Sequence, residues 1–184
     1  MIEWIIVLAV VGIIALIVLI SVYFINRIRI LSNRIENAWS QIDVQLKKRA
    51  DLVPNLVETV KGYMTHEQKA IDMVTKARER MLSAGSTKEK MAAGAGLAAA
   101  LKTIFALAEN YPNLKASDNF KLLQEQLDGI ESKIAYARQF YNDSVLSHNN
   151  LITTIPGRWF AKGRTPHPYF EIAEAERAPV KVSF

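Results

Sequence analysis

The sequence predicts an all-α protein, in which an N-terminal transmembrane helix precedes an antiparallel up-down four-helix bundle with long first and fourth helices. Three observations predict this fold: an uncharged apolar run near the N-terminus, apolar residues at three- and four-residue spacing downstream, and capping signals or prolines at the ends of the periodic stretches. The chain has 184 residues. About 150 of them remain after the apolar run, which is enough for one domain with its own core.

The apolar run covers residues 5–25 and reads IIVLAVVGIIALIVLISVYFI, with no charge and no proline. A helix of this length spans about 30 Å, the thickness of the hydrocarbon core of a bilayer. A cleaved signal peptide starts with basic residues and ends at small ones, whereas here Glu3 precedes the run and Arg27 and Arg29 follow it. The sequence therefore predicts an uncleaved anchor.

The charges that flank the run predict its orientation. Arg27, Arg29 and Arg34 follow it, and the positive-inside rule places that side in the cytoplasm. We expect a single-pass protein of the cell (inner, cytoplasmic) membrane with its N-terminus outside. The expected organisation is an extracytoplasmic N-terminus (1–4), a transmembrane helix (5–25), a helical bundle (26–156) and an extended C-terminal tail (157–184).

The first helix of the bundle continues from the membrane helix without a break. Its apolar residues form a nearly heptad, coiled-coil-like stripe from Ile28 to Val60, and Gly62 is a plausible stop. Pro54 interrupts this pattern. Because a proline removes one helical hydrogen bond, we expect either a bend near residues 51–54 or a break followed by a new helix.

Two capping boxes predict the next two helices. Thr65 and Gln68 form a T-x-x-Q pattern before a helix that ends near Leu82, and Ser86 with Glu89 forms an S-x-x-E pattern before a helix over about 87–109. This third helix is rich in alanine and glycine, which are only weakly apolar. We therefore predict a close-packed soluble helix and not a second membrane span.

The fourth helix begins at Ser117 or Asp118 and stops at Pro156, with apolar residues at strict three-four spacing between them. The first and fourth helices are each about 55 Å long, and the second and third are each about 30 Å long. We therefore expect four helices in the membrane-distal half, and a neck of only the first and fourth helices near the membrane.

Several stretches resemble the signature of the LemA family. They are RIENAWSQIDVQLKKRADLVPNLVETVKGY (34–63), ENYPNLKASDNF (109–120), KIAYARQFYND (133–143) and YFEIAEAERAPVKVSF (169–184). The resemblance covers nearly the whole chain. It implies a bacterial protein with an N-terminal membrane helix, a short outer end and an antiparallel helical domain, and it implies no molecular activity.

The residue types exclude the common catalytic and metal-binding arrangements. There is no cysteine, no G-x-S-x-G motif and no Glu-x-x-His pair of the kind that di-iron bundles use. The run of Lys47, Lys48 and Arg49 is typical of a solvated helix face, and no aromatic interleaving supports nucleic-acid binding. We therefore predict no enzyme, no catalytic residue, no cofactor, no metal and no nucleic-acid partner.

The favoured function is an interaction or scaffolding protein at the cytoplasmic face, with an unidentified protein partner and with homo-oligomerisation left open. The alternative is a small-ligand sensor or an enzyme with a pocket where alanine and glycine thin out the core, near Gly94 and Ala98. A large polar cavity there would favour the alternative, and a dry core with an exposed apolar groove would favour the scaffold.

A polar layer is expected inside the neck. Antiparallel pairing of the first and fourth helices places Asn37 opposite Asn142, and Arg138 opposite Asp43. Buried polar groups must be paired, and such layers can set the register of packed helices. We hypothesise that the two asparagines set register and that Arg138 pairs with Asp43, the alternative being exposed side chains without coupling.

The same pairing places Pro156 opposite Tyr23, at the cytoplasmic edge of the bilayer. The chain then continues with two aromatic and three basic residues: Arg158, Trp159, Phe160, Lys162 and Arg164. Tryptophan favours the headgroup level, and basic side chains favour anionic lipid, which also suits the net charge of +5. We expect these residues to contact anionic headgroups, the alternative being that the aromatic pair folds back onto the helices.

Overall fold

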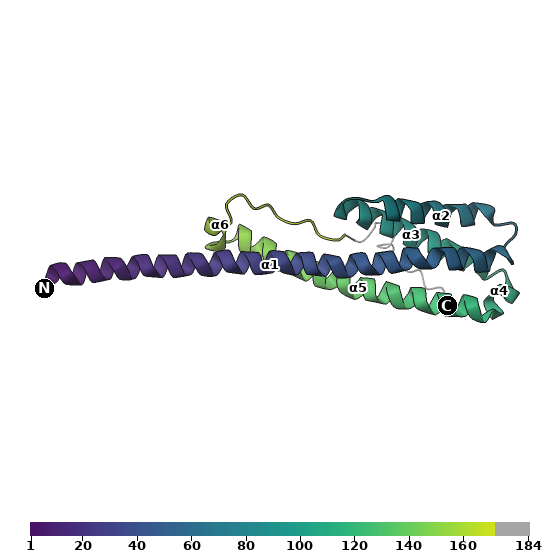
Figure 1. The fold of residues 1–184 in the computed structure, drawn as a ribbon, viewed down its shortest axis with the longest axis horizontal. Coiled ribbons are helices and arrows are strands. Elements are labelled where there is room, and N and C mark those ends of the chain that lie inside the picture. Colours follow the sequence, from purple (N-terminus) through teal and green to yellow (C-terminus); the bar gives the residue numbers. More distant parts are fainter. Residues whose placement is uncertain (172–184) are drawn as a thin grey trace, which may run out of the picture. The chain divides into compact units, whose positions relative to one another are not determined.

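The computed structural model describes residues 1–171, and within that range the chain forms helices and no strands (Figure 1). The helices are α1 (Ile2–Lys61), α2 (Gln68–Ser83), α3 (Thr87–Ala108), α4 (Pro112–Ala116), α5 (Asp118–Thr153) and α6 (Gly157–Phe160). The predicted all-α class with an apolar N-terminal helix is confirmed. The far end of the expected extended tail, residues 172–184, lies outside the described residues.

Among residues 1–171, two helices are long and apolar enough to cross a membrane, α1 and α3. The most apolar stretch of α1 is 0% buried in the protein, as a lipid-facing segment would be, whereas that of α3 is 39% buried. Because α3 places residues such as Leu97 and Ile104 in the core, it is a packed helix of the folded domain.

Helix α1 continues through Pro54, so the break considered from the sequence does not occur (Figure 1). Proline has no N–H, and the carbonyl four residues earlier, that of Ala50, therefore loses its helical donor. The side chain of Arg78 on α2 replaces that donor, because its Nε donates to the Ala50 carbonyl at 3.0 Å. A neighbouring helix thus satisfies the backbone group that the proline leaves open.

The two predicted capping boxes have different outcomes. In the Ser86 box, Ser86 Oγ accepts from the backbone N–H of Glu89, and the Glu89 carboxylate accepts from that of Ser86. The backbone N–H groups of Ser86 and Gly85 donate to the Glu89 carboxylate and lower its pKa. The Thr65 box is wrong, because α2 starts at Gln68 after Glu67, with no side-chain cap.

Two short helices are not expected from the sequence. Helix α4 forms where Pro112 occupies a first-turn position, a place that suits a residue without an N–H. Helix α6 forms just after the predicted stop, which lies three residues beyond the observed end of α5 at Thr153. The tail therefore begins with a helical turn, makes a hydrogen-bonded turn from Ala161 to Arg164, and has no helix from there to residue 171.

The chain divides into two compact units. The first contains Met1–Trp39 and Gln139–Tyr169, and its core includes Ile28, Ile152 and Ala161. In it the ring of Trp39 meets that of Tyr141 edge-on, with the centroids 6.2 Å apart. The pairing that places Asn37 opposite Asn142 also places Ala38 opposite Tyr141, so this contact lies one residue from the expected register.

The second unit contains Ser40–Arg138 together with, among the described residues, Phe170 and Glu171, and the C-terminal part of α1 lies in it with α2, α3, α4 and the N-terminal part of α5. Helices α2 and α3 lie side by side, and Phe105 of α3 packs against Phe120 of α5 with ring centroids 5.8 Å apart. Arg49 of α1 is buried, and it donates from Nη1 to the Gly94 carbonyl at 3.1 Å and from Nη2 to the Glu131 carboxylate. One guanidinium thereby joins α1, α3 and α5.

Candidate interaction surfaces

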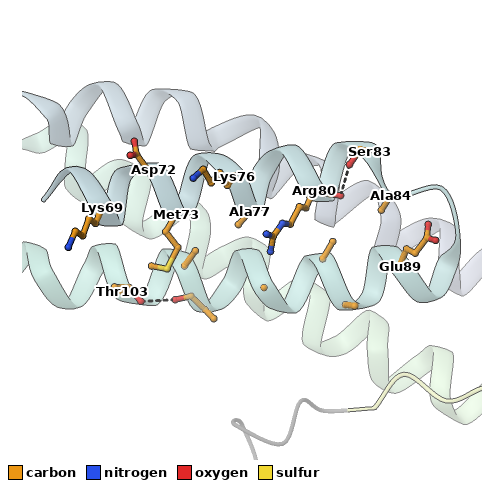
Figure 2. Close-up of a pocket in the computed structure, with 15 residues that line it drawn as sticks. Lys69, Asp72, Met73, Lys76, Ala77, Arg80, Ser83, Ala84, Glu89 and Thr103 are labelled. Atoms are coloured by element: carbon orange, nitrogen blue, oxygen red, sulfur yellow. Dashed lines mark hydrogen bonds between the residues drawn. The ribbon is translucent and has the colours of Figure 1, made fainter.

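A groove of about 1000 Å³ runs along the outer side of α2 and α3 (Figure 2). On each helix, four of the lining residues follow the same spacing of four, three and four, which places them on one stripe of an α-helix. The stripe on α2 is Lys69, Met73, Lys76 and Arg80, and the stripe on α3 is Ala92, Gly96, Ala99 and Thr103. Figure 2 shows Met73 and Arg80 extending from α2 toward α3.

The two stripes differ in chemistry. The α3 stripe carries small side chains, and its one hydroxyl, on Thr103, donates to the Ala99 carbonyl at 3.1 Å. The α2 stripe carries three cations, and no carboxylate within residues 1–171 forms an ion pair with any of them. Of the two groove carboxylates, Asp72 accepts from Gln68 and Glu89 caps α3. The groove therefore has a floor of small residues on α3. Beside it, on α2, lie three cations that pair with no described carboxylate.

The inner side of α3 is tightly packed. A Cβ atom added at Gly94 would lie 2.8 Å from Leu46 Cδ2, closer than real side chains approach, whereas one added at Gly96 would meet nothing within 4 Å. Leu97 and Ala98 beside them are buried. The alanine- and glycine-rich part of the chain thus uses Gly94 to bring α1 close to α3, and Gly96 to leave the outer groove open.

A second surface lies on α6 in the first unit. Its inner face is formed by Gly157, Phe160 and the following Ala161, and the Phe160 ring stacks on that of Phe24 with centroids 5.3 Å apart. Trp159 points the other way and is 69% exposed. The structure therefore divides the aromatic pair: Phe160 packs back onto α1, and Trp159 faces outward.

Three cations accompany Trp159 on this surface. Arg158, Lys162 and Arg164 are exposed, and no carboxylate among the described residues forms an ion pair with them. The five residues expected at the membrane interface are thus brought together around one helical turn. Their contact with lipid stays a prediction.

Hydrogen bonds and a ring contact hold the chain that follows α6 against α5. The side-chain amide of Asn149 donates to the His167 carbonyl and accepts from the His167 N–H, both at 2.9 Å. The Tyr141 hydroxyl donates to the Pro168 carbonyl at 3.2 Å. The buried ring of His148 meets the ring of His167 edge-on at 4.9 Å. The sequence alone does not indicate this arrangement, because the tail has no apolar periodicity that would show where it packs on α5.

Burial lowers the pKa of His148, and the nearby His167 and Arg164 add to the effect, although the side-chain bond to Asn149 opposes it. This side chain is therefore held as the neutral imidazole near neutral pH. Burial also raises the pKa of Tyr141, which stays protonated and able to donate to Pro168.

The residues expected in the neck polar layer have the following surroundings. Asn37 is exposed and Asn142 is half-buried. Asp43 accepts two hydrogen bonds from Lys90 Nζ, each of 2.8 Å, and the guanidinium of Arg138 lies 4.8 Å from the centre of the Phe170 ring. Both Asp43 and Arg138 thus have partners that the sequence does not indicate. The roles of the asparagines in register and the coupling of Arg138 to Asp43 stay predictions.

Arg49 is a charged residue whose buried place differs from the sequence-based prediction. The sequence groups it with Lys47 and Lys48 on a solvated face, and those two lysines are indeed exposed. Arg49 lies three residues after Leu46 and four before Val53, both of which are buried, so its place on the apolar stripe is the available signal. No group of three or more metal-binding side chains occurs within residues 1–171.

Comparison with known proteins gives one family and a few relatives. The model of the LemA family matches residues 38–184. The chain is similar to the magnetosome protein MamQ of Magnetospirillum gryphiswaldense, with 23% identity over 66% of this chain and 54% of the relative. It is also similar to magnetosome protein MamQ 2 of Paramagnetospirillum magneticum, with 30% identity over 52% of this chain and 36% of the relative. The chain thus spans about half or less of the length of these curated relatives.

Proposed function

Because the chain belongs to the LemA family, we propose that it is a single-pass, membrane-anchored interaction protein that presents a helical domain at the cytoplasmic face of the cell membrane. The exposed apolar stretch of α1 supports the anchor, and Arg27 and Arg29 directly after it support the orientation. Contacts of Arg49 and Arg78 that join α1 to its neighbours support an up-down four-helix arrangement of the second unit.

The observation that carries the proposal is the contrast between the two sides of α3. A sensor or enzyme that acts on a small molecule needs a concave pocket that encloses most of the ligand and carries a few convergent polar groups. The inner side at Gly94 is filled by Leu46, and the space beside α3 lies on its outer side as an open groove. An open groove along two helices suits an extended partner better than a small molecule.

The chemistry of the groove defines the partner. A floor of alanine and glycine lets another helix approach closely, and a row of cations from Lys69 to Arg80, which pair with no described carboxylate, attracts acidic side chains. This row is about 16 Å long, which corresponds to three turns of helix. The proposed occupant is therefore an amphipathic helix with an apolar seam flanked by Glu or Asp. A second copy docked by the same face would bring the cations of both copies together, which disfavours it.

The test places a photo-reactive amino acid, p-benzoylphenylalanine, at Gly96 of the full-length protein in its native membrane. Gly129 on α5 is the matched control, because a side chain added there also meets nothing within 4 Å. We expect a discrete cross-linked product from the Gly96 variant, lost when Lys76 and Arg80 are both changed to Glu, and no such product from the Gly129 variant. The peptide attached at position 96 should be helical and acidic by sequence.

Two results would contradict the proposal. Equal cross-linking from both positions, or cross-linking that survives the charge reversal, would mean that the groove does not select a partner. A cross-linked product made of two copies of this chain would mean that the groove binds a second copy and not an acidic helix of another protein.

A further inference from the structure

We propose that α6 is a second membrane attachment, in which Trp159 enters the headgroup layer and Arg158, Lys162 and Arg164 bind anionic lipid. The inference rests on the proposed anchoring of α1 and adds to it a surface with its own ligand, the phosphate-bearing headgroup. It differs from the expectation drawn from the sequence, because Phe160 packs onto α1 and leaves Trp159 as the single aromatic residue of the pair that faces outward.

The stacking of Phe160 on Phe24 sets the level of α6 along α1. Phe24 is the second-to-last residue of the uncharged run, and Arg27 is the first charged residue after it. A helix that spans a bilayer places this transition from apolar to basic residues at the headgroups. Since Phe160 contacts Phe24, the adjacent Trp159 lies at the same level as the transition.

The side chains exposed on α6 have the chemistry that this level favours. Tryptophan concentrates at membrane interfaces because its ring is amphipathic, and basic residues are attracted by anionic headgroups. Trp159 is 69% exposed, and none of the three cations forms an ion pair with another described residue. Arg27 and Arg29 are also exposed, so basic side chains of α1 lie directly after the same transition.

Tight packing on both sides fixes the direction in which Trp159 points. At the start of α6, a Cβ atom on Gly157 would lie 2.1 Å from the Leu151 carbonyl oxygen, so only glycine lets the chain turn this closely onto α5. After α6, the two hydrogen bonds between Asn149 and His167 hold the chain. The exposed ring is therefore presented by a fixed turn, which reduces the conformational entropy lost when it binds.

A lipid surface fits these observations better than a protein partner does. The surface has one exposed aromatic ring, that of Trp159, and dispersed cations that no described carboxylate pairs with, which is the chemistry that an anionic lipid surface attracts. It also lies at the end of the membrane-spanning stretch, where lipid is already present in high concentration. A protein that covered Trp159 is the outcome that the experiment must separate from this one.

The test uses full-length protein in nanodiscs and compares the three tryptophans of the chain, Trp4, Trp39 and Trp159. Three variants each keep one tryptophan and carry Phe at the other two positions. Each is placed in discs of neutral phosphatidylcholine, or of phosphatidylcholine mixed with anionic phosphatidylglycerol, and its quenching by brominated lipid is measured. Trp4, at the end of the apolar helix, reports membrane insertion, and Trp39, which packs against Tyr141, reports a protein-covered ring.

We expect the emission of Trp159 to shift to the blue in anionic discs, and its quenching to be at least twofold greater there than in neutral discs. Changing Arg158, Lys162 and Arg164 together to Gln should remove this difference. Changing the exposed Lys133 of α5 to Gln is the control and should leave it unchanged.

The inference is overturned if Trp159 is no more quenched than Trp39, which would mean that protein or water surrounds it. Equal quenching in neutral and anionic discs, unaffected by the triple Gln variant, would overturn the binding of anionic headgroups. Failure of the anchor itself gives a different result, because Trp4 would then lose its quenching too.

Discussion

Replacing Arg78 by Met tests whether a side chain of α2 completes the backbone hydrogen bonds of α1. Ala50 is fully buried, and its carbonyl accepts from Arg78 Nε at 3.0 Å because Pro54 has no N–H to donate. Leaving a buried carbonyl without a donor costs about 1–3 kcal/mol. The Arg78→Met variant should therefore lose about 2 kcal/mol of unfolding free energy, or about 4–8 °C in Tm for a chain of this size.

A second substitution makes the prediction specific. Pro54→Ala restores an N–H four residues after Ala50, so it should stabilise the Arg78→Met protein by about 1–2 kcal/mol more than it stabilises the parent protein. The assay is thermal and urea unfolding of the full-length protein in detergent, followed by far-UV circular dichroism. Arg80→Met on the exposed side of α2 is the control, and it should change stability by less than about 0.5 kcal/mol.

The reasoning is refuted if the Pro54 and Arg78 substitutions are additive to within about 0.3 kcal/mol. Additivity would mean that the Ala50 carbonyl finds another donor, and that Arg78 contributes only the packing of its aliphatic stem.

The remaining predictions concern membrane topology and pH. In whole cells, Glu3→Cys should react with an impermeant maleimide, and Asn113→Cys, at an exposed position of α4, should react only after lysis. If only Asn113→Cys is labelled in whole cells, the protein has the opposite orientation. Because the folded-state pKa of His148 lies below its ordinary value of 6.5, the folded state binds fewer protons than the unfolded state, and stability should fall as the pH drops below about 6.5. His148→Gln should remove that part of the pH dependence of Tm, whereas His66→Gln, at an exposed position, should retain it.

Periodicity and capping chemistry were enough to predict most of the helices. The apolar stripe of α1 predicts a helix by its spacing, and the box at Ser86 and the stop at Gly62 mark helix ends. A local signal gave the wrong start for α2, where the backbone forms other hydrogen bonds. Thr65 does not cap α2, because the chain makes two hydrogen-bonded turns at Met64 and Glu67 before the helix begins.

The sequence by itself determined that this protein is helical, that it belongs to the LemA family, and that it carries an uncharged helix long enough to span a bilayer. These properties depend on residue type and on spacing along the chain. Only the tertiary structure decided what Arg49, Arg78 and Trp159 contact. Arg49 and Arg78 donate to carbonyls of other helices, at Gly94 and at Ala50, and the sequence indicates neither acceptor. Trp159 faces outward, because Phe160 beside it takes the inner position on Phe24. The physical reason is that a side chain's partner is set by which helices pack together and at what register, and this depends on contacts between residues far apart in the chain.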